Sequence, residues 1–269
     1  MKMVKKILLG LVATATLVGF ASCKMSDDEE NAIKGSGNDK EINHTNESEN
    51  DSYRAYISTN LKHAGALVKI TFEEPSNDNF SKMGVIFGLH DSKNVNDAVD
   101  FYIIGLAGTD KCNFYVSKFE NITNLQGKNF GALINATGNN PKETVYVNLN
   151  QSTIKTATDI TLPSKAEDGS ISVYVYYKAL KNGKYEWAVL DFTDEEAKKT
   201  NLETFDLTSV TASKVLKHGE IDNAFDEVTD AKKVPQDKIA VYAMVSPKKT
   251  LKGKWHFSST YLAAEEIAE

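Results

Sequence analysis

Hard oxygen donors gathered in residues 91–100 are the first side chains whose types and spacing could do chemistry. Asp91, Asn94, Asn96, Asp97 and Asp100 supply carboxylate and amide oxygens within one short segment, and such ligands suit calcium. The spacing is not that of an EF-hand, because a lysine occupies the third position and the glycine is missing. The segment is therefore a weak calcium candidate through Asp91, Asp97 and Asp100. An acidic connection between two strands is the alternative.

Other metal-binding and nucleophilic residues form no recognisable motif. His63, His90, His218 and His256 are scattered along the chain without a close histidine pair, so zinc has no support. The sequence also lacks a nucleophile elbow, a phosphate loop and a dinucleotide fingerprint. Apart from possible calcium, we expect no cofactor and no catalytic residue.

Aromatic side chains are the remaining residues that could contact a ligand. Trp187 is in phase with Tyr185 and Val189 in an alternating segment, so we expect it inside the fold. Tyr174 and Tyr176 have the opposite phase to their valine neighbours. Exposed rings on a sheet stack on sugar faces or anchor protein partners. We expect Tyr174 and Tyr176 to form an exposed ligand-binding pair. The alternative is that they are buried, as most aromatic rings of a β-sandwich are.

Short segments rich in β-branched and aromatic residues must position these side chains. They are bounded by Gly, Asn, Asp or Pro, and many alternate between apolar and polar residues, which predicts half-buried antiparallel strands. Asn182-Gly183 predicts a tight hairpin, since both residues tolerate positive φ. The fold class is therefore all-β, an antiparallel two-sheet sandwich. The predicted strands are 65–72, 83–90, 99–106, 112–119, 144–149, 170–177, 185–192, 238–245 and 252–258.

Helix is expected in two places only. Thr193-Asp-Glu-Glu196 has the form of a capping box and should open a short helix through Lys199. Residues 261–269 are expected to add a final turn or two, and 208–212 a further strand within a long connection. Cys112 alternates with apolar neighbours, which is typical of a small buried hydrophobe.

The N-terminal residues predict where the protein is located rather than what it binds. Lysines precede an apolar run over 7–20, and Ala21-Ser22 lead into Cys23, which is the layout of a secretory signal. The run is too short to cross a bilayer, which needs about 20 apolar residues. The segment resembles the lipobox of bacterial lipoproteins, with Phe20 where leucine is usual. This resemblance implies a signal peptide over 1–22 and a lipid on Cys23. Ordinary cleavage that leaves a thiol on Cys23 is the alternative.

Residues 24–51 are rich in Asp, Glu, Asn, Ser and Gly and have almost no bulky apolar side chain. Such composition predicts disorder, so we expect a lipidated acidic tether over 23–52 and one β-sandwich domain over 53–269. Asp27-Asp28-Glu29-Glu30 resembles the surface-export signal of some outer-membrane lipoproteins, or is a solvated spacer. The expected location is the bacterial cell envelope, lipid-anchored in the outer membrane and surface-exposed, with the periplasm as the alternative.

Charge excludes one class of partner. The formal net charge is −6, and removing residues 1–22 makes the chain more acidic because three lysines leave with them. Arg54 is the only arginine, although arginine is the residue best suited to phosphate recognition. Nucleic-acid binding depends on basic residues that neutralise phosphates, so we expect no nucleic-acid partner.

One group of segments resembles a known fold family. Gly84-Val-Ile-Phe-Gly88 is followed by Asp91-Ser92, then by Asp100–Gly105 with its aromatic pair, then by Asn113–Val116. This order resembles the concanavalin-A-like, or laminin-G-like, jelly-roll family. The resemblance implies two curved antiparallel sheets, often with carbohydrate or protein ligands on a concave face.

Glycoside hydrolases on this fold carry a Glu-Ile-Asp-x-Glu motif, in which the first Glu is the nucleophile and the last the general acid. Glu220 and Asp222 match this motif, but the last position holds Ala224. Without the acid the leaving group is not protonated. We therefore predict that the chain is not an enzyme.

Three functions stay open from sequence. The first is a membrane-anchored lipoprotein with a lectin-like domain for glycan or protein ligands, the second an envelope-assembly lipoprotein in the periplasm, and the third a glycan-active enzyme. An exposed aromatic strip in a groove would favour the first. A flat apolar edge patch would favour the second, and two carboxyl groups at hydrolase spacing the third.

Overall fold

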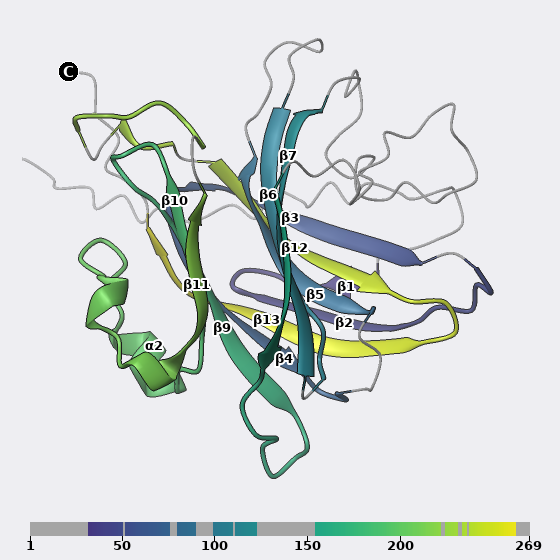
Figure 1. The fold of residues 1–269 in the computed structure, drawn as a ribbon. Helices are drawn as coiled ribbons and strands as arrows, with labels where there is room; N and C mark the ends of the chain where they lie inside the picture. The colour runs from purple at the N-terminus through teal and green to yellow at the C-terminus, as the bar shows by residue number, and fades with distance from the viewer. Residues whose placement is uncertain are drawn as a thin grey trace, which may run out of the picture.

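The chain folds as two antiparallel β-sheets packed face to face (Figure 1). The structure is a computed structural model, and it describes residues 32–50, 52–75, 80–89, 99–109, 111–122, 154–221, 224–230, 233–235 and 237–261. The expected all-β, antiparallel two-sheet sandwich is confirmed. Within the described residues, one sheet has seven strands in the order β1-β2-β13-β4-β9-β10-β11, and the other has six in the order β3-β12-β5-β6-β7-β8.

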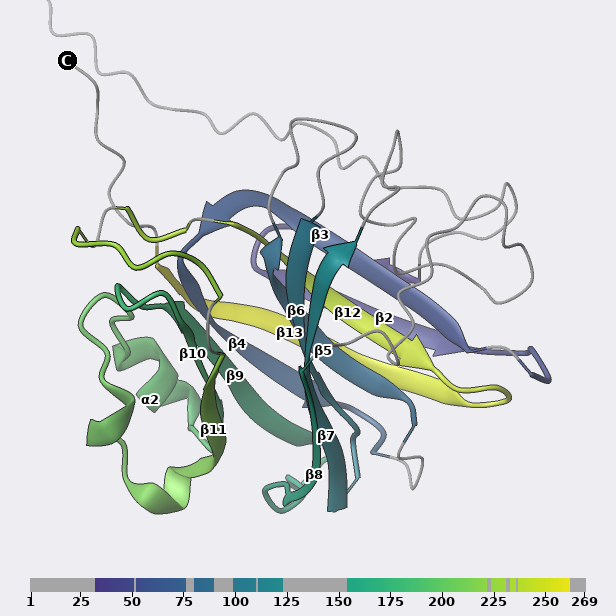
Figure 2. The same cartoon turned by 45° about the horizontal axis from the view of Figure 1, so that its top comes forward.

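Figure 2 shows the two sheets from a second direction, with the single α-helix of the described residues outside the seven-stranded sheet. The seven-stranded sheet contains β1 (Ile33–Lys34), β2 (Asp39–Thr45), β4 (Gly65–Phe72), β9 (Ile171–Ala179), β10 (Tyr185–Leu190), β11 (Val215–Ile221) and β13 (Thr250–Tyr261). The six-stranded sheet contains β3 (Tyr53–His63), β5 (Lys82–Leu89), β6 (Val99–Leu106), β7 (Lys111–Ile122), β8 (Ile154–Thr161) and β12 (Asp237–Val245). The helix is α2 (Asp194–Lys199).

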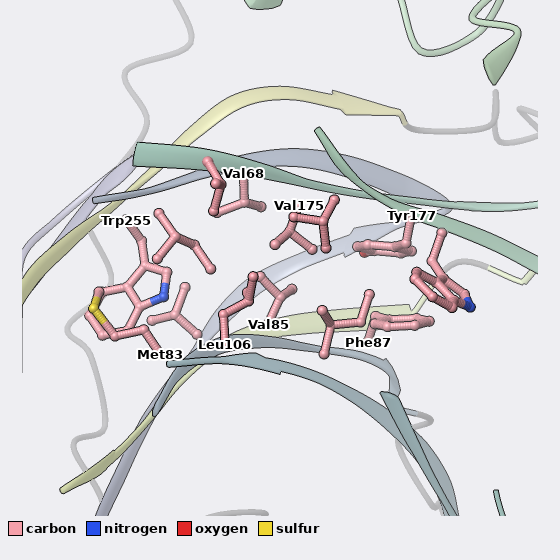
Figure 3. Packing of buried hydrophobic residues seen from close by; sticks show 14 of the residues in the cluster. Val68, Met83, Val85, Phe87, Leu106, Val175, Tyr177 and Trp255 are labelled. Carbon is pink, nitrogen blue, oxygen red and sulfur yellow. The ribbon is translucent and has the colours of Figure 1, made fainter. Parts of the chain in front are cut away.

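The main core lies between the sheets, where alternate residues of both sheets meet (Figure 3). The Phe87 ring of β5 stacks on the Tyr177 ring of β9, with centroids 4.4 Å apart. The Trp255 indole of β13 donates a hydrogen bond of 3.1 Å to the Gly84 carbonyl oxygen of β5. Trp187 is also inside, as expected. Burial of such large side chains stabilises each by a few kcal/mol, on the order of 1.5–3 for a full side chain.

Apart from the predicted strand over 208–212, the predicted strands agree with the structure within a few residues wherever the structure describes them. The predicted strand 144–149 lies outside the described residues. Cys112 is buried, as expected. The Asn182-Gly183 hairpin is confirmed, because Gly183 has a φ of 80° and the turn joins β9 to β10. The sequence interpretation did not include β1, β2, β3, β8 or β11.

The predicted strand over 208–212 is wrong. Two 3₁₀ helices, Leu207–Ser209 and Ala212–Lys214, take its place. The Asp206 side chain accepts a hydrogen bond of 2.9 Å from the Thr208 backbone N–H, and such local bonds compete with sheet pairing. Of the expected C-terminal helix, Tyr261 belongs to β13 and residues 262–269 lie outside the described residues.

The predicted tether boundary is wrong as well. Residues 33–45 contain β1 and β2, and β2 pairs with β13 over seven residues. Ile33 and Ile42 lie in the main core at 2% and 1% exposure. A strand near a sheet edge has one face in the core and one face in water, so it needs few apolar residues. The polar composition of this segment therefore resembles that of a disordered tether. The folded domain therefore includes residues 33–45 rather than starting at residue 53.

Outside the seven-stranded sheet, residues 191–214 form what we call the strap, which contains α2 and both 3₁₀ helices (Figures 1 and 2). The capping box is confirmed, since Thr193 Oγ1 accepts from the Glu196 N–H and Glu196 Oε2 accepts from the Thr193 N–H. The strap buries its own small core against the outer face of the sheet. The strap's share of this core is Ala197, Leu202 and Leu207. In the part of the chain that the structure describes, no helix is long and apolar enough to cross a membrane.

Ile42→Ala tests whether β2 is part of the fold. Deleting buried methyl groups costs about 2–5 kcal/mol, so we expect the free energy of unfolding to fall by about that amount in urea titrations. Asn43→Ala, a change on the same strand outside the main core, is the control and should have little effect. Equal unfolding curves for wild type and Ile42→Ala would mean that the segment is a tether after all.

Candidate ligand-binding groove

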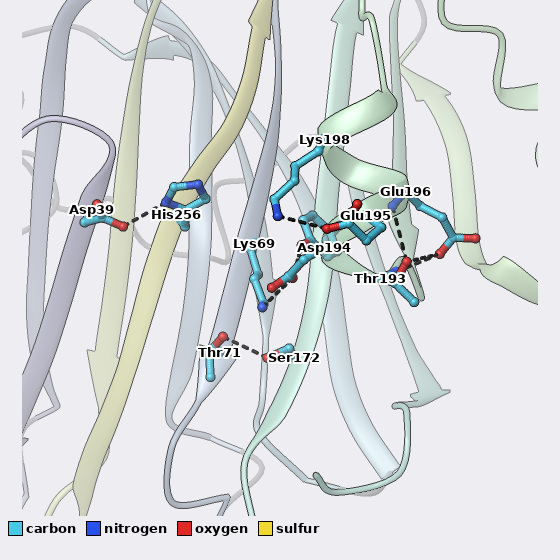
Figure 4. Close-up of polar contacts among 11 residues, drawn as sticks. Asp39, Lys69, Thr71, Ser172, Thr193, Asp194, Glu195, Glu196, Lys198 and His256 are labelled. Carbon is cyan, nitrogen blue, oxygen red and sulfur yellow. Dashed lines mark hydrogen bonds and ion pairs between the residues drawn. The ribbon is translucent and has the colours of Figure 1, made fainter.

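A groove of about 700 Å³ lies on the outer face of the seven-stranded sheet, which we call the outer groove. Its floor comes from β2, β13, β4 and β9, and α2 of the strap forms one wall (Figure 4). The groove is lined by Gly35, Ser36, Asp39, Lys40, Glu41, Lys69, Thr71, Tyr174, Asp194, Lys198, Lys254, Trp255, His256 and Ser258.

Strand register arranges the floor as two rows of side chains. In the first row, Asp39 of β2 pairs with His256 of β13, His256 with Lys69 of β4, and Lys69 with Tyr174 of β9. Directly opposed residues on one face have Cβ atoms about 4.5–5.5 Å apart, so neighbours in the row are within reach of each other. His256 Nδ1 lies 2.8 Å from Asp39 Oδ1.

The second row lies two residues further along each strand. It consists of Glu41, Lys254, Thr71 and Ser172, again directly opposed in the register. The Thr71 and Ser172 hydroxyl oxygens are 2.8 Å apart and share a hydrogen bond. Lys254 forms an ion pair with Glu73 just beyond the row. Alternation of side chains along each strand makes this floor polar while the opposite face carries the main core.

The first turn of α2 joins the strap to the first row. Lys69 Nζ and the Tyr174 hydroxyl both donate to Asp194 Oδ1, each at 2.6 Å. These hydrogen bonds, from Lys69 first and Tyr174 second, hold the pKa of Asp194 below its usual value. Burial, and then the hydrogen bond to Asp194, raise the pKa of Tyr174. The carboxylate is therefore ionised and the phenol neutral at neutral pH.

One end of the groove is formed by the β1–β2 hairpin. Lys40 is buried there, and its Nζ donates to the Gly37 carbonyl oxygen at 2.7 Å. Burial lowers the pKa of Lys40, and the nearby Asp39 charge opposes that shift. The Lys40 hydrogen bond therefore closes the turn between β1 and β2, and residues of this hairpin line that end of the groove.

The expectation of an exposed Tyr174–Tyr176 pair is wrong. Both rings point away from the main core, as their phase predicted, but they are only 2% and 0% exposed. The strap covers them, and apolar residues of the strap pack on them. The Tyr176 hydroxyl donates to Glu186 at 2.8 Å. Tyr174 still lines the outer groove. Whether either residue contacts a ligand stays a prediction.

The other predicted site residues lie elsewhere. Cys23, Asp91, Asp97 and Asp222 are outside the described residues, and Asp100 is in β6 with its side chain among those not described. Calcium binding by that segment therefore stays a prediction. Among the described residues, no three His, Cys, Asp or Glu side chains gather as a metal site.

Glu220 of the hydrolase-like motif lies on β11, across from Glu186 of β10. Its carboxylate forms an ion pair of 2.9 Å with Lys184. Neither Glu220 nor its ion-pair partner lines the outer groove. A solvated ion pair on this strand therefore accounts for Glu220.

Sequence reasoning did not single out most of the groove residues, including Lys69, Asp194 and Lys254. The available signal was alternation, because Lys69-Ile-Thr71 and Lys254-Trp-His256 place polar groups on one face of strands whose other face is apolar. Which strands are neighbours depends on long-range pairing. The side-by-side arrangement of β2, β13, β4 and β9 therefore could not be inferred from these local patterns.

Comparisons with known proteins concern the fold. No protein-family model matches the chain, and no curated protein matches it. Among solved structures, a legume lectin-like domain from Entamoeba histolytica is 10% identical, covers 87% of this chain and 89% of its own, and has a TM-score of 0.44. The calcium-bound exoplasmic/lumenal domain of VIP36 is 9% identical over 88% and 84%, with a TM-score of 0.41. The metal-free carbohydrate recognition domain of Emp46p is 10% identical over 86% and 87%, with a TM-score of 0.38.

The pKa of Asp194 should report the contacts of the strap with the groove floor. Because its folded-state pKa is lowered, these contacts stabilise the fold at neutral pH, and the contribution is lost as pH falls through that lowered pKa. In Lys69→Met and Tyr174→Phe variants we expect the Asp194 pKa to rise toward 3.8, its ordinary value, measured by NMR of the side-chain carboxyl group.

Asp206 provides an internal control in the same spectra. Its pKa is lowered by hydrogen bonds from Thr208, which neither variant touches, so it should not move. An Asp194 pKa equal in wild type and both variants would contradict the contacts described.

Proposed function

We propose that this domain binds glycans in the outer groove. The observation that carries the proposal is the pair of polar rows across four strands, which present hydroxyl, ammonium, imidazole and carboxylate groups at cross-strand spacing. Sugars offer hydroxyl groups that both donate and accept hydrogen bonds. A groove that presents fixed donors beside fixed acceptors satisfies such a ligand at many points.

The composition of the groove supports a glycan rather than a protein ligand. Protein interfaces obtain most of their binding energy from buried aromatic and apolar anchors. The floor of the outer groove is polar, and among the described residues the exposed large apolar side chain is Phe80, which does not line it. Recognition by hydrogen bonds, without an aromatic platform in the described part of the groove, fits these residues.

The electrostatics of the groove support binding without catalysis. A glycoside hydrolase needs a carboxylic acid whose pKa is raised, so that it carries a proton to the leaving group. At Asp194 the pKa is shifted in the other direction, by Lys69 and Tyr174. We propose a lectin-like role rather than an enzymatic one.

We further propose that the domain is held to a membrane by a lipid on Cys23 and displayed on the outer membrane. The support is the lipobox-like sequence ending at Cys23 and the acidic cluster at 27–30. Two or more acyl chains anchor a protein stably, since each buried CH₂ contributes about 0.8 kcal/mol. An envelope-assembly role is the second candidate. The same signal sequence is consistent with it if the protein stays in the periplasm.

Glycan binding is tested with an oligosaccharide array, followed by calorimetry on the best ligand. Lys69→Met and Thr71→Val remove hydrogen-bonding groups from the two rows, and a hydrogen bond to a charged group is worth about 1.5–3 kcal/mol. We expect Lys69→Met to weaken binding about tenfold or more, since 1.4 kcal/mol is about a factor of ten, and Thr71→Val to weaken it less.

Glu227→Gln is the matched control, because Glu227 is exposed and does not line the groove. Urea unfolding of each variant shows whether the fold is kept. No glycan binding by the wild type, or binding that both groove variants leave unchanged, would contradict the proposed site.

Anchoring is tested by protease treatment of intact cells. We expect the wild type to fractionate with membranes and to be digested from outside, and Cys23→Ala to be released from the membrane fraction. Resistance until the envelope is broken would favour the periplasmic role. Unchanged membrane retention of Cys23→Ala would contradict lipidation.

A further inference from the structure

Three lysines that line the outer groove each form an ion pair with a carboxylate of the chain. Lys69 is 2.6 Å from Asp194, Lys198 is 3.0 Å from Glu195, and His256 is 2.8 Å from Asp39. Lys254 is paired with Glu73. Figure 4 shows the first three pairs spread along the floor and the α2 wall. Positive and negative groups therefore alternate, and no part of the described floor is a cluster of one sign.

A negatively charged ligand meets two obstacles in such a groove. Its carboxylate or sulfate would lie near Asp39, Glu41 and Asp194, which line the same space, and like charges at short range repel. A lysine that bound it would either keep its carboxylate partner beside the new anion, where the two like charges repel, or have that partner displaced. Displacement leaves a carboxylate of the chain without its cation, which removes most of the gain.

The Lys69–Asp194 ion pair is held in place by an additional hydrogen bond. Asp194 is fixed a second time by the Tyr174 hydroxyl, which donates to the same oxygen at 2.6 Å. The Lys69 side chain is 25% exposed and that of Asp194 61% exposed, so both remain within reach of a ligand. The pair is accessible, yet its charges are already balanced.

An uncharged hydroxyl group meets neither obstacle. An ammonium group has three N–H donors and a carboxylate accepts several hydrogen bonds, so the Lys69–Asp194 pair keeps donors and an acceptor oxygen after its own bond is made. One hydroxyl hydrogen of the Thr71–Ser172 pair also remains after their shared bond is made. A neutral sugar binds to these remaining positions without breaking an ion pair.

We propose that the outer groove selects uncharged glycans and discriminates against those that carry uronic-acid or sulfate groups. This selectivity rests on the glycan-binding function proposed above and names its ligand class. It also makes affinity nearly independent of ionic strength, because no net charge is neutralised on binding.

The test compares two ligands that differ only at C6, where one has a hydroxymethyl group and the other a carboxylate. Calorimetry on the full chain measures binding of a neutral hexose oligomer and of the same oligomer oxidised at C6 to uronic acids, at low salt and at roughly 0.5 M salt, where charges are strongly screened. We expect the neutral oligomer to bind about tenfold or more tightly, which corresponds to about 1.4 kcal/mol, and salt to change its affinity less than about twofold.

Asp194→Asn probes the ion pair itself, because the amide keeps the shape of the side chain while removing the charge that balances Lys69. We expect the ratio of affinities to move several-fold toward the acidic oligomer. Glu195→Gln, an exposed substitution that releases Lys198, should move the ratio in the same direction and keeps the test valid if Asp194→Asn unfolds. Glu227→Gln should leave the ratio unchanged.

The outcomes separate this inference from the function on which it rests. Equal or tighter binding of the acidic oligomer by the wild type would overturn the selectivity and leave glycan binding in place. A ratio that neither Asp194→Asn nor Glu195→Gln changes would also overturn it. Binding of neither oligomer, nor of any glycan on the array, would overturn both proposals.

Discussion

The register of β13 is the constraint on which both the core and the groove depend. The strand pairs with β4 on one side and β2 on the other, so its alternate residues are assigned to two different environments at once. Trp255 faces the six-stranded sheet, while His256 next to it faces the groove. A slip of one residue would exchange these faces along the whole strand. The Trp255 hydrogen bond to Gly84 opposes such a slip.

The strap explains why one outer face has two different halves. Over β9 and β10 it buries Tyr176, Ala188 and Leu190, which creates a third layer with its own apolar core. The polar rows begin beside α2, which forms the edge of the area that the strap covers. The groove is therefore the part of the sheet that the strap leaves uncovered, with Asp194 at the boundary between the two halves.

Sequence patterns predicted the elements that depend on interactions between residues close in the sequence. Alternating apolar residues predicted β4 and β10, and the Thr193–Glu196 capping box predicted α2. Side-chain phase also gave the correct direction for Tyr174. Its burial could not be predicted, because the strap that covers it joins the sheet through long-range contacts. The same limit applies to β2, where a single core isoleucine, Ile42, was too weak a signal to outweigh a polar composition.

The position of β2 has a mechanical consequence. Asp39 and Glu41 on this strand line the groove, and β1 begins at Ile33, ten positions after Cys23. Ten residues reach at most about 35 Å when fully extended. With a lipid on Cys23, a pull exerted by bound ligand would pass from the groove through β2 and β1 to the membrane without crossing the six-stranded sheet. The load would pass through the strands of the seven-stranded sheet that lie between the ligand and β1.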